Sequence, residues 1–130
     1  MIKKRILEPD RVRHIQGGFS FIPHRFLTDG FLASLGQTEI LLYLFLVLAS
    51  DRNGLSFYSY DAICTLLQIT VDDYVEARDG LIHKDLIAFD GTLFQVLDLP
   101  EKPILKDVEK PLCYGHLTIK GLVEQSIRGM

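Results

Sequence analysis

The stretch that decides the fold is SYDAICTLLQITVDDYVEARDGLIHKDLIAFDGTLFQVL, residues 59–97. Ser59 is a candidate N-cap, and the apolar residues that follow it recur at helical spacing. The spacing therefore predicts a helix over Tyr60–Leu67. Gln68-Ile69 then interrupts the apolar pattern, so this helix is expected to end there.

A second helix is predicted immediately after this interruption. Thr70 offers a hydroxyl for the N-cap and Asp73 follows three residues later, which is typical of a helix start. The helix is expected to run from Val71 to about Lys84. This part of the stretch is thus predicted to form two helices joined by a tight turn.

The third part of the stretch predicts a β-hairpin. Leu86–Phe89 and Leu93–Leu97 are two strand-like runs, and Asp90-Gly91-Thr92 joins them. Asp-Gly between apolar runs favours a primed turn, because both residues tolerate positive backbone angles. We expect this hairpin to form a two-stranded wing.

Toward the N-terminus, the sequence predicts a short helix over about Pro23–Thr28, because proline fits the first turn of a helix. A longer helix is predicted to begin at a capping box of Ser34 and Gln37 and to run to about Asp51. This helix is apolar nearly all round. It is equally consistent with a central core position and with half of a homodimer interface.

Between the long helix and residue 59, Gly54 is expected to end the helix, since glycine readily adopts the left-handed conformation. The aromatic run Leu55–Tyr58 then predicts a short strand.

Two motifs in this arrangement resemble those of a known family. LIHKDLIAF (81–89) resembles the L-x-x-x-G-L-I signature that closes the third helix of winged helix-turn-helix domains and opens the wing. ICTLLQITVDDYV (63–75) resembles their I-A-x-x-L-G-I-S-x-x-x-V turn. Asp85 and Gln68 stand where the family has glycine, and Thr70 stands where it has a capping serine.

The long apolar helix, with the Ile22-Pro23-His24 segment before it, is similar to the N-terminal domains of replication-initiation proteins of the DnaD and RepA kinds. The resemblance covers roughly residues 20 to 99. It implies a mainly helical winged helix-turn-helix fold with a small β-hairpin, and a role in DNA transactions such as transcription regulation or replication initiation. Winged helices also serve as protein-interaction modules, so a protein partner is the alternative.

The sequence divides into three parts. Residues 1–18 are predicted to form a basic N-terminal arm, residues 19–99 the winged helix domain, and residues 100–130 a linker with a C-terminal helix over 115–128. The composition, with 48% apolar and 24% charged residues, is that of a folded protein.

Nothing in the sequence predicts an enzyme. The four histidines lack metal-ligand spacing, there is no glycine-rich phosphate loop, and no catalytic residues, metal site or cofactor is predicted. Cys64 and Cys113 fit neither a disulfide framework nor a C-x-x-C motif, which is typical of reduced thiols in a cytoplasmic protein. The apolar run over residues 40–49 is too short to cross a bilayer, so no membrane partner is expected.

Candidate DNA contacts lie in the arm and the wing. The net charge of −3 gives no overall attraction for nucleic acid, so any basic surface must be local. Between residues 1 and 25, six lysines and arginines face two acids, a local charge of +4. The predicted DNA-binding residues are Lys3, Lys4, Arg5, Arg11, Arg13 and Arg25, with Thr92 at the wing.

The helix that would normally read the major groove is acidic. Helical spacing predicts a core-facing stripe of six residues and leaves four carboxylates outside. The predicted core stripe is Val71, Tyr74, Val75, Arg78, Leu81 and Ile82. The carboxylates are Asp72, Asp73, Glu76 and Asp79. DNA phosphates repel such a face, so it is predicted to be either a solvated surface or a docking site for a basic protein partner.

Arg78 falls inside the predicted apolar stripe, where an unpaired charge is costly. We expect it to pair with Asp61 or Glu39, or to emerge at a subunit contact.

Overall fold

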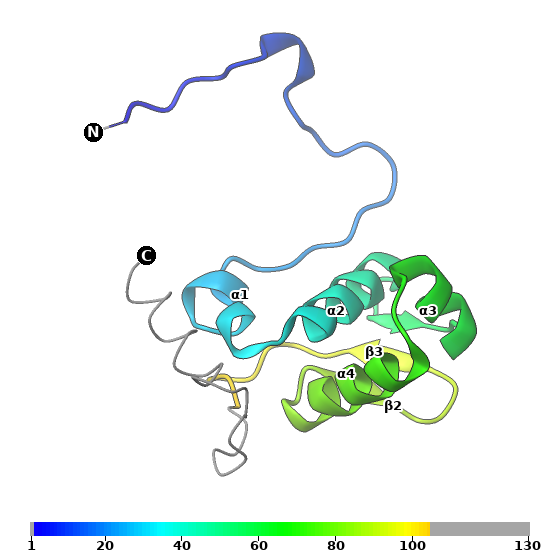
Figure 1. Ribbon diagram of the computed structural model, residues 1–130. Coiled ribbons are helices and arrows are strands. Elements are labelled where there is room, and N and C mark those ends of the chain that lie inside the picture. The colour runs from blue at the N-terminus through cyan, green and yellow to red at the C-terminus, as the bar shows by residue number, and fades with distance from the viewer. Residues whose placement is uncertain (1, 105–130) are drawn as a thin grey trace.

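The computed structural model describes residues 2–104 of the chain, shown in Figure 1. The helix predicted over 115–128 and most of the predicted linker lie outside the described residues. The elements are the 3₁₀ turns η1 (Pro9–Arg11) and η2 (Leu32–Ser34), the helices α1 (Arg25–Thr28), α2 (Gln37–Ala49), α3 (Tyr60–Leu67) and α4 (Val71–His83), and the strands β1 (Leu55–Ser56), β2 (Ile87–Phe89) and β3 (Phe94–Val96).

The fold is mainly helical with one small sheet, as predicted. Helices α2 and α4 pack against each other, and α3 packs against α4. The three strands form an antiparallel sheet in the order β1-β3-β2, so the hairpin is extended on its β3 side by the strand after α2. The core lies between the helices and this sheet. Its fully buried larger side chains are Phe31, Leu42, Leu46, Ile63, Leu81, Leu86, Ile87 and Phe94.

Helix α2 begins two residues later than the sequence predicted, and with a different cap. Gly36 is the N-cap, and its backbone N–H donates to Oε1 of Glu39 at 2.9 Å. Ser34 instead lies in η2, where its hydroxyl donates to the carbonyl of Phe31. The predicted Ser34–Gln37 box is therefore wrong, because the chain still turns in a 3₁₀ conformation at that point.

The turn after α2 is held by one carboxylate. Oδ1 of Asp51 accepts the backbone N–H groups of Asn53 at 2.8 Å and Leu55 at 3.0 Å. Gly54 ends the turn with φ +85°, and a Cβ there would lie 2.5 Å from the carbonyl oxygen of Val96. Gly54 therefore serves both the turn and the close approach of β3.

These turn carboxylates predict a specific acid sensitivity. Hydrogen bonds from the backbone of Leu55 and then Asn53 hold the pKa of Asp51 below its ordinary value of 3.8, and those from Leu93 and Thr92 do the same for Asp90. A depressed folded-state pKa stabilises the fold above the ordinary pKa, and this contribution is lost as the pH falls through the folded value. The free energy of unfolding should therefore fall as the pH drops below about 3.8.

The measurement is urea unfolding at pH values between 6 and 2. The double variant Asp51→Asn and Asp90→Asn should show a shallower dependence on pH in the acid range, because asparagine keeps an acceptor oxygen but does not titrate. An equally steep dependence in this variant would contradict the assignment.

The turn between α3 and α4 confirms the predicted helix-turn-helix. Gln68 adopts a left-handed conformation with φ 58°, and the hydroxyl of Thr70 accepts the N–H of Asp73 at 3.0 Å. Asp85, after α4, is also left-handed with φ 63°. Both left-handed residues stand where the resembling motifs carry glycine, at a backbone strain of about 1–2 kcal/mol each.

The predicted wing is also confirmed. Oδ1 of Asp90 accepts the N–H groups of Thr92 at 2.8 Å and Leu93 at 2.7 Å, which closes the hairpin around Gly91. Phe89 and Phe94 are direct partners across the strands, and their rings stack at 4.3 Å. The strands are shorter than predicted, at Ile87–Phe89 and Phe94–Val96, although the N–H of Leu97 still donates to the carbonyl of Leu86 at 3.0 Å.

A buried ion pair joins the start of α2 to the end of α4. Nζ of Lys84 donates to Oε1 of Glu39 and to the carbonyl of Ser34, both at 2.7 Å. Only 6% of the lysine side chain and 13% of the glutamate side chain are exposed. The other oxygen of Glu39 lies against Gly80, where a Cβ would come within 1.9 Å of it. This contact sets how closely α2 approaches α4.

Candidate nucleic-acid interface

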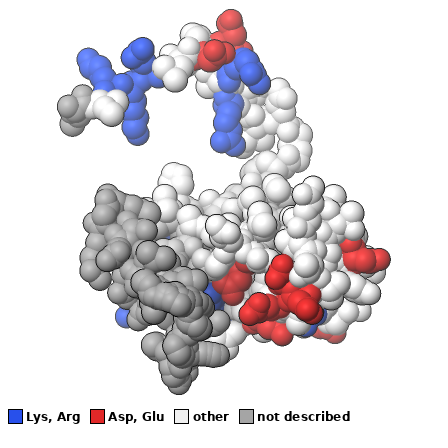
Figure 2. Space-filling view, viewed as in Figure 1, with Lys and Arg blue, Asp and Glu red and all other residues white. Residues whose placement is uncertain are grey.

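The N-terminal arm, residues 2–18, is exposed at every position. Apart from η1, it has no regular secondary structure, and Figure 1 shows it extending away from the helices. Figure 2 shows basic side chains along the arm and acidic side chains on the body of the molecule. Five of the seven predicted DNA-binding residues are in the arm: Lys3, Lys4, Arg5, Arg11 and Arg13.

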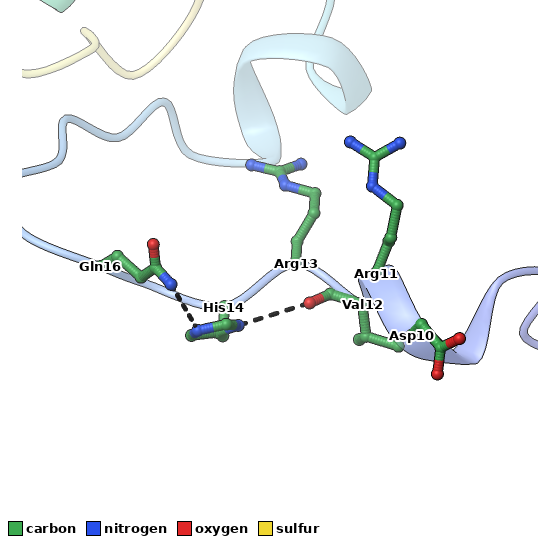
Figure 3. A pocket seen from close by; sticks show the side chains of 6 residues that line it. All are labelled: Asp10, Arg11, Val12, Arg13, His14 and Gln16. Carbon is green, nitrogen blue, oxygen red and sulfur yellow. Dashed lines mark hydrogen bonds between the residues drawn. The ribbon is translucent and has the colours of Figure 1, made fainter.

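The middle of the arm presents two guanidinium groups together. The side chains of Arg11, the last residue of η1, and Arg13 point the same way from the backbone (Figure 3). Gln16 Nε2 donates to His14 Nε2 at 2.9 Å, and His14 Nδ1 donates to the carbonyl of Val12. These residues, with Asp10, line an open hollow of about 380 Å³. The pair of parallel cations is suited to backbone phosphates.

Arg25 does not lie with the arm residues. Its guanidinium donates to the carbonyls of Leu99, Pro100 and Glu101, and it pairs with Asp29 at 3.1 Å. Its contacts therefore join α1 to the segment after β3. Thr92 lies exposed in the hairpin turn, where the neighbouring side chains carry no positive charge. The structure thus brings neither residue to the basic arm.

Helix α4 is turned about its axis relative to the prediction. Its buried residues are Tyr74, Ala77 and Leu81. Val71, Val75 and Ile82 were predicted to face the core, but they are 48%, 36% and 39% exposed. Tyr74 and Leu81 are therefore core residues as predicted, whereas the assignment of Val71, Val75 and Ile82 to the core was wrong. Ala77 is buried instead, and Gly80 lies against Glu39 of α2, where the lack of a side chain allows the two helices to approach closely.

The exposed side of α4 consequently carries two parallel stripes. The apolar stripe is Val71, Val75 and Ile82, with Arg78 among them. The acidic stripe, one residue further along at each step, is Asp72, Glu76 and Asp79, followed by His83. Figure 2 shows acidic side chains over this part of the body. The fourth predicted carboxylate, Asp73, is also exposed and lies in the first turn of the helix. Periodicity identified the acids, but the apolar stripe was missed because its residues were assigned to the core.

Arg78 does not pair with Asp61 or Glu39, so that part of the prediction is wrong, and its emergence at a subunit contact stays a prediction. Its guanidinium pairs with its neighbour Asp79 at 3.2 Å and stacks over the rings of Tyr74 and Phe89 at 5.5 and 5.3 Å. Glu39 is taken by Lys84 instead. The ion pair, the cation–π contacts and the 24% of the side chain that stays exposed satisfy the charge without a buried partner.

Comparison with known families agrees with this geometry. Residues 33–87, from η2 to the first residue of β2, match a family described as a helix-turn-helix domain. The chain carries a helix-turn-helix domain. The antiparallel hairpin that follows α4 makes it a winged helix-turn-helix domain. No protein with a curated description and no solved structure matches the chain. The narrower similarity to replication-initiation proteins stays a prediction.

The described residues were also compared with the requirements of a metal site, a reactive thiol and a membrane-spanning helix. Among residues 2–104, no three histidine, cysteine, aspartate or glutamate side chains are grouped so as to hold a metal ion. Burial, with smaller effects from Asp61 and Asp73, raises the pKa of the Cys64 thiol, which disfavours the reactive thiolate. No helix in the described part of the chain is long and apolar enough to span a membrane.

Proposed function

We propose that this protein is a non-enzymatic, DNA-associated winged helix protein that acts in transcription regulation or replication initiation and contacts DNA chiefly through its basic arm. The observation that supports this most strongly is the exposed arm itself, in which five lysines and arginines face two acids. Such arms reach into the minor groove or follow the phosphates. The helix-turn-helix domain supports DNA as the partner, since this domain is typical of DNA-binding proteins.

The exposed side of α4 argues against the usual mode of DNA recognition, in which a helix reads the bases in the major groove. In a DNA-bound helix-turn-helix the second helix of the motif lies in the major groove. Here that helix would place Asp72, Glu76 and Asp79 against phosphates and base edges. Repulsion replaces the release of counterions that normally drives binding. The arm is the better contact, and Thr92 in the turn of the wing is a separate candidate contact.

The test is the affinity for a non-specific DNA duplex measured at several salt concentrations. If each of the five arm cations neutralises one phosphate, the slope of log K against log salt is about −4.5, so affinity falls about 500-fold between 50 and 200 mM salt. Deleting residues 1–18 should remove most of this dependence. The deletion leaves the core intact, because the arm side chains are exposed.

A matched pair of variants makes the test sharper. Arg11→Gln with Arg13→Gln should make the slope shallower by about 2, because two phosphate contacts are lost. Arg52→Gln with Lys102→Gln removes the same charge from exposed positions outside the arm and should leave the slope unchanged. Thr92→Ala should also leave the slope unchanged. Equal effects of the two double variants, or no binding by the full chain at 50 mM salt, would refute the proposal.

The second candidate function is a protein-interaction module that docks a basic partner on α4. The observation that favours it is the apolar stripe beside the acidic stripe, since DNA offers little for exposed valine and isoleucine while a protein partner can bury them. On this alternative, the predicted partner-binding residues are Asp72, Asp73, Glu76 and Asp79. Their loss would leave DNA affinity unchanged or higher.

A further inference from the structure

The two stripes of α4 define what a ligand for this face must offer. The apolar stripe needs aliphatic side chains, and the acidic stripe, one residue away at each turn, needs cations. Both stripes run the length of the helix, from Val71 to Ile82 and from Asp72 to Asp79. An extended segment that carries positive charge on one side and apolar groups on the other matches this arrangement.

The arm of this chain has that chemistry. Arg11 and Arg13 project on one side of the backbone, and the side chain of Val12 points to the other side (Figure 3). The arm also leaves Ile6, Leu7 and Ile15 largely exposed. A segment that served only to follow phosphates would have no use for these aliphatic side chains.

We propose that the exposed face of α4 binds the N-terminal arm of a second copy of this chain. Charge complementarity supports this occupant, because the arm combines five cations with two acids while the exposed side of α4 combines the carboxylates of Asp72, Glu76 and Asp79 with one cation, Arg78, which pairs with Asp79. Within one chain, the arm extends on the far side of α2 from α4 (Figure 1), so an arm from another copy is the occupant in reach without rearrangement. The inference goes beyond the proposed DNA contact and does not depend on it.

The contact would make self-association and DNA binding compete for the same side chains. Arg11 and Arg13 cannot pair with carboxylates of α4 and with phosphates at once. Free chains would therefore hold their arms on one another, and DNA would release them. Because the contact is largely ionic and exposed, it should weaken as salt rises.

The experiment is sedimentation velocity on the full chain without DNA, over a range of protein concentrations at 50 and 500 mM salt. We expect concentration-dependent association at the lower salt. Arg11→Glu with Arg13→Glu, or Glu76→Lys with Asp79→Lys, should each raise the dissociation constant about tenfold or more, because attractive pairs become repulsive. Mixing these two variants should restore association, since the reversed charges again complement each other.

Two controls separate this contact from other modes of association. Asp98→Lys with Glu101→Lys reverses two exposed acids outside α4 and should leave association unchanged. Leu44→Lys and Leu48→Lys disturb the exposed apolar side of α2 and should also have no effect. Circular dichroism of each variant checks that the fold is kept.

Several outcomes would overturn the inference. If the chain stays monomeric at all concentrations, the exposed face of α4 does not bind the arm of a second copy. Association that survives both charge reversals but is lost in the α2 variants would assign the interface to α2. Salt-dependent DNA binding is measured separately, so the loss of one result leaves the other standing.

Discussion

Replacing Glu39 with glutamine is expected to lower the free energy of unfolding by about 3 kcal/mol. The reason is the partner that remains. Lys84 donates to Glu39 and to the carbonyl of Ser34 from a position where only 6% of its side chain is exposed. Without the carboxylate, a buried ammonium group is left with neutral acceptors only, and such a charge is strongly destabilising.

Urea unfolding of a double-mutant cycle measures this effect. Lys84→Met should also be destabilising, because it leaves the carboxylate of Glu39 buried beside the Gly36 N–H alone. The double variant Glu39→Gln with Lys84→Met should be more stable than the sum of the two single effects predicts, since neither charge is then left unpaired. A loss below about 1 kcal/mol for Glu39→Gln, within the range of exposed pairs, would show that the pair is solvated.

Replacing Gly80 with alanine should lower the free energy of unfolding by about 2 kcal/mol, although the same change in an exposed helix interior stabilises by up to about 1 kcal/mol. The added Cβ would meet Oε2 of Glu39 at 1.9 Å and its Cδ at 3.0 Å. The carboxylate cannot swing away easily, because Lys84 and the Gly36 N–H hold its other oxygen.

The residue at position 39 decides whether Gly80→Ala raises or lowers the free energy of unfolding. In a Glu39→Ala chain the obstructing carboxylate is gone, so Gly80→Ala should become neutral or stabilising relative to that background. In a Glu39→Gln chain the side chain keeps its size, so the substitution should remain destabilising. Thermal or urea unfolding of the four single and double variants gives the comparison. A cost that is equal in all backgrounds would place its cause elsewhere, in the backbone of α4.

The sequence allowed prediction of the features that depend on local chemistry. Thr70 caps α4 through the N–H of Asp73, and Asp90 closes the hairpin, because each of these hydrogen bonds spans only two or three residues. The helix-turn-helix followed from these signals. Motif spacing also placed the turn at Gln68, even though the residue is not glycine.

Features that depend on distant residues were not predictable in this way. Lys84 and Glu39 are 45 residues apart, and nothing in either local pattern indicates that they meet. The orientation of α4 was missed for a related reason. Gly80 faces Glu39 at the contact with α2, whereas hydrophobicity alone ranks Val75 above Ala77 as a core residue.

In the candidate interface, too, local features were predictable and contacts between distant residues were not. The acids of α4 and the cations of the arm could be listed from the sequence. Arg25 was grouped with the arm because it is close in sequence and basic. Its hydrogen bonds go to carbonyls 74 to 76 residues away, which only the folded chain reveals.

The contacts of Arg25 also hold the two ends of the folded domain close together. One guanidinium spans from the first helix to the carbonyls of residues 99–101, so the chain enters and leaves the folded unit at neighbouring points. The same two ends are also held by apolar packing, since Phe26 lies in the core and Leu99 packs against it. A pulling force applied at residues 25 and 101 would therefore act first on the hydrogen bonds of Arg25 and on this packing, at the point where both flanking segments join the domain.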